Sequence, residues 1–134
     1  MNIVINILLV DDVEHTRELL RSILLSCINE QKINIKANFF HSKTGLNIPQ
    51  RITDDKINLV YLDIELPTTT GLTILKEVRQ SHPDLMVVMV SGESSTENVT
   101  SSIKMGANGF IVKPFNSDRV IDSLKNYIKK VYKI

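Results

Sequence analysis

The chain has 134 residues, of which 43% are hydrophobic and 23% charged, an ordinary composition for a globular protein with a sizeable core. Sixteen basic residues nearly balance 15 acidic ones, and the formal net charge is +1, which argues against a surface for nucleic acid or membrane. A single cysteine excludes an intramolecular disulfide, and no apolar run approaches the roughly 18 residues of a membrane helix. We expect one cytoplasmic domain over residues 1–134, without direct nucleic-acid binding or membrane insertion.

The first strand and the first helix have clear patterns. Residues 5–10 are almost all apolar, as in a strand that is covered on both faces, and the run stops at Asp11 and Asp12. Apolar residues at helical spacing, with charged residues between them, then predict a helix over 14–29.

The second quarter of the chain has weaker signals. Alternating apolar and polar residues predict a strand over 33–40. Residues 42–56 contain few apolar residues, and there we expect either a short helix beginning near Pro49, which suits a first helical turn, or an irregular loop.

A buried strand is predicted where residues 59–62, all apolar or aromatic, run directly into Asp63. Pro67 cannot extend a central strand, so the chain must turn between the two residues. A helix over 72–80 and an unbroken apolar strand over 85–90 follow.

The last third of the chain repeats this alternation. Ser94 and Glu97 have the spacing of a capping box, which predicts a helix that starts there and ends near Gly106. A short strand over 109–112 ends at a Lys-Pro pair, and a final helix is predicted over 117–132. Its expected buried residues are Val120, Ile121, Leu124, Ile128 and Val131.

Strands alternating with helices predict an α/β fold with a parallel sheet and helices on both faces. In such a sheet the carboxyl ends of the strands lie at one edge, where ligands bind. Four strands end in residues with acidic, hydroxyl or basic side chains: Asp11 and Asp12, Asp63, Ser91 and Lys113. Three crowded carboxylates repel one another, and Mg²⁺ removes that conflict. Together with an ammonium and a hydroxyl, they make a site for phosphoryl transfer, with Asp63 as a possible nucleophile.

The motifs at these strand ends resemble those of the receiver domain of two-component response regulators, the CheY-like family, over essentially the whole chain. They are the acidic pair Asp11-Asp12, the pattern D-x-x-[apolar]-P-x-x-x-G from Asp63 to Gly71, Ser91-Gly92, and Lys113-Pro114-Phe115. The resemblance implies a flavodoxin-like, doubly wound five-stranded parallel sheet with strand order 2-1-3-4-5.

The resemblance also implies the residues that form the phosphorylation site. Asp63 corresponds to the phosphoacceptor. Asp12 corresponds to the acid that binds Mg²⁺ directly, together with Asp63 and the backbone carbonyl of Glu65, and Asp11 to the acid that reaches the ion through water. Lys113 corresponds to the lysine that pairs with the phosphoryl group.

Other positions correspond to parts of the switch. Ser91 matches the hydroxyl that binds a phosphoryl oxygen, and Phe110 the aromatic residue whose rotamer reports phosphorylation. Phe110 has no hydroxyl, so a switch there would act by packing alone. The Lys113–Pro114 bond is expected to be cis. Glu65 is acidic at a position that varies in the family, and we expect it near the entrance of the site.

The implied function is a signalling switch that catalyses only its own phosphorylation and dephosphorylation. A sensor histidine kinase or a histidine phosphotransfer protein would be the phosphoryl donor. Phosphorylation would change the binding of a downstream protein, or of a second copy, through the fourth helix, fifth strand and fifth helix. The chain is either a stand-alone receiver or part of a longer regulator.

Other interpretations stay open at this point. The chain could be a Mg²⁺-dependent α/β phosphatase that uses Asp63 as nucleophile, with Glu65 as a second acid. A flavodoxin-like cofactor binder is less well supported, because no glycine-rich phosphate loop follows the first strand. Taken alone, Asp12 is more typical of a helix N-cap than of a metal ligand, and the other strand-end residues reverse this preference.

Overall fold

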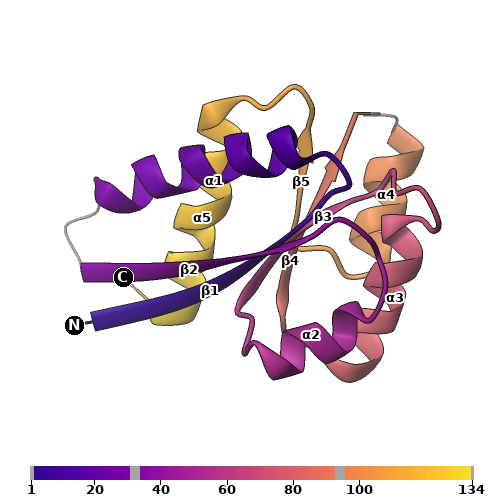
Figure 1. Ribbon diagram of the computed structural model, residues 1–134, viewed down its shortest axis with the longest axis horizontal. Helices are drawn as coiled ribbons and strands as arrows, with labels where there is room; N and C mark the ends of the chain where they lie inside the picture. Colours follow the sequence, from indigo (N-terminus) through magenta and orange to yellow (C-terminus); the bar gives the residue numbers. More distant parts are fainter. Residues whose placement is uncertain (1, 31–33, 93–95, 134) are drawn as a thin grey trace.

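Strands and helices alternate through the chain and form three layers (Figure 1). The structure is a computed structural model that describes residues 2–30, 34–92 and 96–133. Within these ranges the elements are β1 (Asn2–Val10), α1 (Glu14–Asn29), β2 (Asn34–Ser42), α2 (Ile48–Asp54), β3 (Leu59–Asp63), α3 (Gly71–Ser81), β4 (Met86–Ser91), α4 (Thr96–Lys104), β5 (Gly109–Val112) and α5 (Ser117–Tyr132).

The described strands pair in the order β2-β1-β3-β4-β5, and each neighbouring pair is parallel. This confirms the predicted flavodoxin-like sheet with the strand order 2-1-3-4-5. β3 and β4, in the middle of the sheet, are buried at every position, which explains why their sequences are apolar without alternation.

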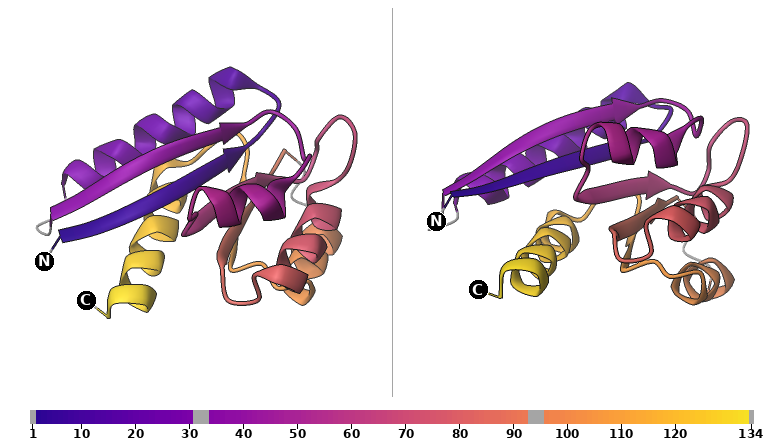
Figure 2. Two further views of the ribbon diagram at one scale, coloured as in Figure 1. Left: turned by 60° about the horizontal axis from the view of Figure 1, so that its bottom comes forward. Right: turned by 90° about the horizontal axis from the view of Figure 1, so that it is seen from below.

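Each face of the sheet has its own hydrophobic core. One core joins alternate residues of the strands to α1 and α5, and it includes Leu24, Tyr61 and Leu124. The other joins the intervening strand residues to α2 and α3, and it includes Ile52 and Leu75. The further views show the helices on opposite faces of the twisted sheet (Figure 2). Successive strand residues point to opposite faces, so both cores are filled by the same strands.

β1 begins at Asn2, three residues earlier than predicted. The additional residues pair only with β2, from Asn2 opposite Asn34, whereas β3 joins β1 at Ile7. The two strands therefore extend together beyond the rest of the sheet, as Figure 1 shows. Ile3 and Ile5 are buried in the core under α1 and α5, which stabilises this extension by removing apolar surface from water.

The weakly patterned segment around Pro49 is a helix, α2, with that proline in its first turn. Of the two alternatives predicted from the sequence, a short helix or an irregular loop, the helix is therefore correct. Ile48 and Ile52 are buried on its inner face. Two predicted boundaries, Ile33 of the second strand and Ser94 of the fourth helix, lie outside the described residues.

One predicted core residue of α5 is wrong. Val131 is 47% exposed, whereas the neighbouring Tyr127 is 3% exposed and belongs to the core. The ring of Tyr127 meets that of Tyr132 edge to face, with centroids 6.3 Å apart. The two aromatic rings thus cover the end of the core that a continued aliphatic stripe was expected to fill. In the part of the chain that the structure describes, no helix is long and apolar enough to cross a bilayer.

Candidate functional site

The carboxyl ends of four strands bring the predicted residues to one edge of the sheet. The strand register places Val10 beside Leu62, Asp63 beside Val90, and Ser91 beside Val112. Asp11 and Lys113 directly follow β1 and β5. Residues separated by up to about a hundred positions in the sequence thus become neighbours, as the topology of a parallel sheet requires.

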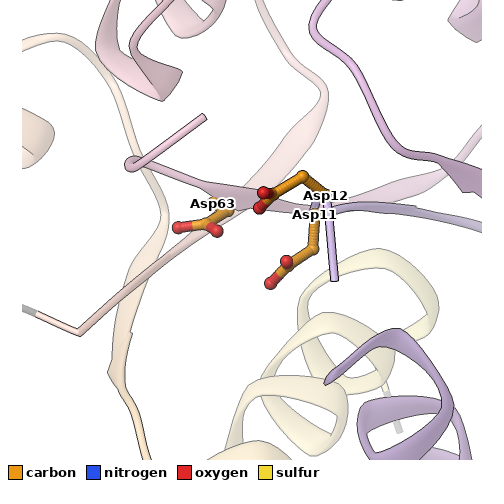
Figure 3. A group of neighbouring side chains, drawn as sticks. All are labelled: Asp11, Asp12 and Asp63. Atoms are coloured by element: carbon orange, nitrogen blue, oxygen red, sulfur yellow. The ribbon is translucent and has the colours of Figure 1, made fainter. Parts of the chain in front are cut away.

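Three carboxylates form the centre of this edge (Figure 3). Asp11, Asp12 and Asp63 each offer a carboxylate oxygen, and these atoms all lie within 4.8 Å of one another. Asp11 and Asp63 are 5% and 2% exposed, whereas Asp12 is open to solvent. Hard oxygen donors at this spacing, with one side open to water, fit Mg²⁺, which binds through a few carboxylates and keeps several waters.

Asp12 does not cap α1, which removes the simplest structural explanation for the acidic pair. The N-cap of α1 is Val13, and in the described part of the chain no side chain caps this helix. Asp11 instead uses Oδ1 to accept a hydrogen bond of 2.9 Å from the backbone N–H of Val13. This bond orients the Asp11 carboxylate at the end of β1 and leaves Oδ2 for a second partner.

Lys113 is that second partner, and it joins two strand ends. Its Nζ donates to Asp11 Oδ2 at 2.8 Å and to Asp63 Oδ2 at 3.0 Å. Burial lowers the pKa of Lys113, but its hydrogen bonds and charge contacts with Asp11 and Asp63 outweigh this and raise the pKa above its ordinary value. The ammonium therefore stays charged between the two carboxylates. The Lys113–Pro114 bond is cis, as predicted.

The Asp63 carboxyl is held in an environment that opposes its ionisation. Burial raises its pKa to about 6, against the hydrogen bond and charge of Lys113, which lower it, and with a further increase from Asp11. A backbone N–H from Glu65, at 3.0 Å from Asp63 Oδ1, also favours the charged form. At neutral pH Asp63 is mostly ionised, but its charge is incompletely balanced.

Close packing behind Asp63 sets the course of the loop that follows it. A Cβ on Gly71 would collide with the carbonyl oxygen of Asp63 and lie 2.8 Å from the Cα of Ile64. The backbone N–H of Gly71 donates to the carbonyl of Ile64 at 2.8 Å. The glycine of the D-x-x-[apolar]-P-x-x-x-G pattern therefore has a structural reason: it allows α3 to start against the backbone of the Asp63 loop.

Glu65 makes contacts that the sequence analysis did not anticipate. Its Oε2 accepts a hydrogen bond of 2.7 Å from the Ser91 hydroxyl, and its Oε1 accepts one of 2.8 Å from the backbone N–H of Gly92. The adjacency of β3 and β4 was the available signal, because it places a residue just after Asp63 beside one just after Val90. The rotamer that makes the contacts has no signature in the sequence.

Phe110 lies apart from these polar groups. It stands within β5, three positions before Lys113, and is half-buried against the core formed with α2 and α3. Of the predicted site residues, the structure thus brings Asp11, Asp12, Asp63 and Lys113 together. It joins Ser91 to Glu65 beside them and leaves Phe110 in the adjacent packing.

Comparisons with known proteins find similar sequences and a similar fold over most of the chain. A family model described as "Response regulator receiver domain" matches residues 7–125. The chain is 30% identical over 125 residues to the chemotaxis protein CheY of Listeria monocytogenes, covering 93% of this chain and 99% of the relative. It is 32% identical to a putative NtrX-like response regulator of Rickettsia felis, of which it spans only 24%.

A similar solved structure is the receiver domain of NtrX from Brucella abortus. It is 34% identical to this chain, with a TM-score of 0.75, and the alignment covers 92% of this chain and 98% of that one. The chain therefore matches both a relative of about its own length and part of a longer one.

Proposed function

The chain belongs to the response regulator receiver domains, a family of signalling switches, and from this premise we propose that it is phosphorylated on Asp63. The observation that carries the proposal is the Lys113 ammonium, which contacts Asp11 and Asp63 at 2.8 and 3.0 Å. The ammonium links the buried Asp63 carboxylate to Asp11 beside it. The nucleophilic oxygen of Asp63 therefore lies next to a positive charge that is held in place. We further propose that residues 1–134 make one receiver domain.

The reaction transfers a phosphoryl group from a phosphohistidine of a sensor kinase or a phosphotransfer protein. A carboxylate oxygen of Asp63 attacks phosphorus, a P–O bond forms, and the P–N bond breaks with its electron pair passing to the imidazole nitrogen. Lys113, already within 3.0 Å of Asp63 Oδ2, pairs with an oxygen of the transferred group. Ser91, at the end of the neighbouring strand, supplies a hydroxyl donor for another. Such contacts favour the charge of the transition state.

The donor set fits a magnesium ion. Asp11, Asp12 and Asp63, with the backbone carbonyl of Glu65, are the groups that would hold it. When bound, the ion would offset the negative charge of the carboxylates and of the phosphoryl oxygens. Among the described residues, Lys113 contacts two of these three acids, Asp11 and Asp63. One ammonium does not balance three neighbouring carboxyl groups, so the cluster has a physical need for a further cation.

The output of the switch is a change in binding through α4, β5 and α5, in which Ser91 and Phe110 move. Support comes from the weak attachment of α4. Ser102 on its inner side is fully buried, and its hydroxyl has no hydrogen-bond partner among the described residues, while Ile103 is 54% exposed. A helix with few buried apolar contacts and an unsatisfied polar group costs little to displace. The partner whose binding changes is a downstream protein or a second copy of this chain.

The phosphatase interpretation finds no support at Glu65. Both carboxylate oxygens of Glu65 accept hydrogen bonds from Ser91 and Gly92 rather than contacting Asp63, and the family to which the chain belongs consists of signalling switches. We therefore propose the signalling switch alone.

The experiment is to incubate the protein with acetyl phosphate and Mg²⁺ and to measure its intact mass. We expect one phosphoryl adduct on the wild type and none on Asp63→Asn. Asp84→Asn, which removes an exposed acid before β4, is the matched control and should form the adduct normally. No adduct on the wild type, or an adduct on Asp63→Asn, would show the proposal to be wrong.

A further inference from the structure

The Glu65 carboxylate accepts hydrogen bonds from two donors at the end of β4. Ser91 Oγ donates to Oε2 at 2.7 Å, and Gly92 N donates to Oε1 at 2.8 Å. Each carboxylate oxygen thus has its own donor, and the Ser91 residue beneath it is 0% exposed. A hydroxyl and a backbone N–H that converge on an anion in this way form a small anion-binding site. In the present structure the anion is a side chain of the protein itself.

This small site is the one that a phosphoryl group on Asp63 would need. Asp63 pairs with Val90 in the sheet, one residue before Ser91, and the backbone N–H of Glu65 already binds Asp63 Oδ1 at 3.0 Å. A phosphoryl group and the Glu65 carboxylate are both anions that accept hydrogen bonds. They cannot share one serine proton, and their like charges repel each other at this range.

The contact is built so that it can be released. Glu65 as a residue is exposed, although its two oxygens are hydrogen-bonded. Its side chain can rotate into solvent without opening either hydrophobic core, and water can then replace the lost donors. Ser91 cannot rotate into solvent because it is buried at the end of β4, so any movement of its hydroxyl stays within the site. The mobile partner in the contact is therefore Glu65.

We propose that Glu65 is an internal competitor of the phosphoryl group. In the unphosphorylated protein its carboxylate holds the Ser91 hydroxyl and the Gly92 amide, and phosphorylation of Asp63 displaces it into solvent. Glu65 therefore slows phosphorylation and keeps Ser91 in its unswitched position until the phosphoryl group arrives. This inference rests on the proposed function, since it concerns what competes for the same donors.

The test compares rates of adduct formation with acetyl phosphate and Mg²⁺ by intact mass. Glu65→Ala should be phosphorylated at least about tenfold faster than the wild type, the size expected for losing a charge-assisted hydrogen bond and a like charge. Glu77→Ala removes an exposed charge from α3 and should react at the wild-type rate. If the wild type forms no adduct, the proposed function fails. If it forms one and Glu65→Ala is no faster than Glu77→Ala, this inference fails and the function stands.

A second comparison separates competition for Ser91 from a general effect of charge. The acceleration by Glu65→Ala is measured again in a Ser91→Ala background. Because the competitor acts partly through the serine hydroxyl, the acceleration should shrink by at least about threefold. An acceleration of unchanged size would mean that Glu65 acts by its charge alone, and it would overturn the proposal. In the unphosphorylated protein, amide exchange at Gly92 should also be faster in Glu65→Ala than in the wild type, and equal exchange would contradict the proposed hold on that amide.

Discussion

Replacing Asp63 by asparagine should stabilise the metal-free protein. The Asp63 carboxyl is 2% exposed, and burial raises its pKa from 3.8 to about 6. One pKa unit corresponds to about 1.4 kcal/mol, so the ionised carboxylate lowers the free energy of unfolding by about 3 kcal/mol at pH 8. Asparagine has the same shape and no charge, and it should recover most of this amount.

The gain must depend on pH in a defined direction. The folded-state pKa lies above the unfolded one, so below the unfolded value the carboxyl is neutral in both states and costs nothing. The penalty grows as the pH rises between the two values and is complete above the folded pKa. At pH 5 the gain from Asp63→Asn should therefore be about half of that at pH 8.

Denaturant unfolding in EDTA at the two pH values measures both quantities. Asp84→Asn, at an exposed site, should change neither the free energy of unfolding nor its dependence on pH. Saturating Mg²⁺ should reduce or reverse the difference, because it stabilises the intact cluster more than one that lacks a ligand. An Asp63→Asn protein that is no more stable than the wild type at pH 8, or equally stabilised at both pH values, would show that the buried charge of Asp63 does not destabilise the fold.

Three further changes test other parts of the account. Gly71→Ala should lower the free energy of unfolding by more than about 3 kcal/mol or prevent folding, because its Cβ would collide with the backbone after β3. Gly109→Ala is the control: its Cβ contacts are no closer than 3.6 Å, so denaturant unfolding should give a free energy within about 1 kcal/mol of the wild type. Tyr61→Phe should lower the free energy of unfolding by about 1 kcal/mol, since it removes a buried hydroxyl 2.6 Å from Ser123 Oγ. The double variant with Ser123→Ala should lose less than the sum of the two single losses. Mg²⁺ at about a hundred times its Kd should raise the free energy of unfolding of the wild type by about 2.7 kcal/mol in thermal unfolding. Asp12→Asn should lose most of this gain. An equal gain in both proteins would show that Asp12 does not bind the ion.

The sequence was informative wherever one physical constraint dominated. β3 and β4 are covered on both faces, so their apolar runs predicted their positions within a residue. The predicted convergence of Asp11, Asp63 and Lys113 followed from the topology alone, because parallel strands end at one edge. The structure adds the distances of 2.8 and 3.0 Å that join them.

Other features depend on partners that are distant in the sequence. β1 is longer than predicted because β2 continues beside it, which the residues of β1 do not encode by themselves. Val131 has the right spacing for the core but is exposed, since the rings of Tyr127 and Tyr132 pack at that end of α5 instead. The Glu65 contact with Ser91 depends on a side-chain rotamer, for which a single sequence contains no signal.

The most direct test of the central claim is to find the residue that carries the phosphoryl group. After incubation with acetyl phosphate and Mg²⁺, borohydride reduces an aspartyl phosphate to homoserine, and peptide mass spectrometry then identifies the position. We expect homoserine at position 63 of the wild type and at no other aspartate. Homoserine at another position, or unmodified Asp63 in protein that has gained a phosphoryl group, would contradict this expectation.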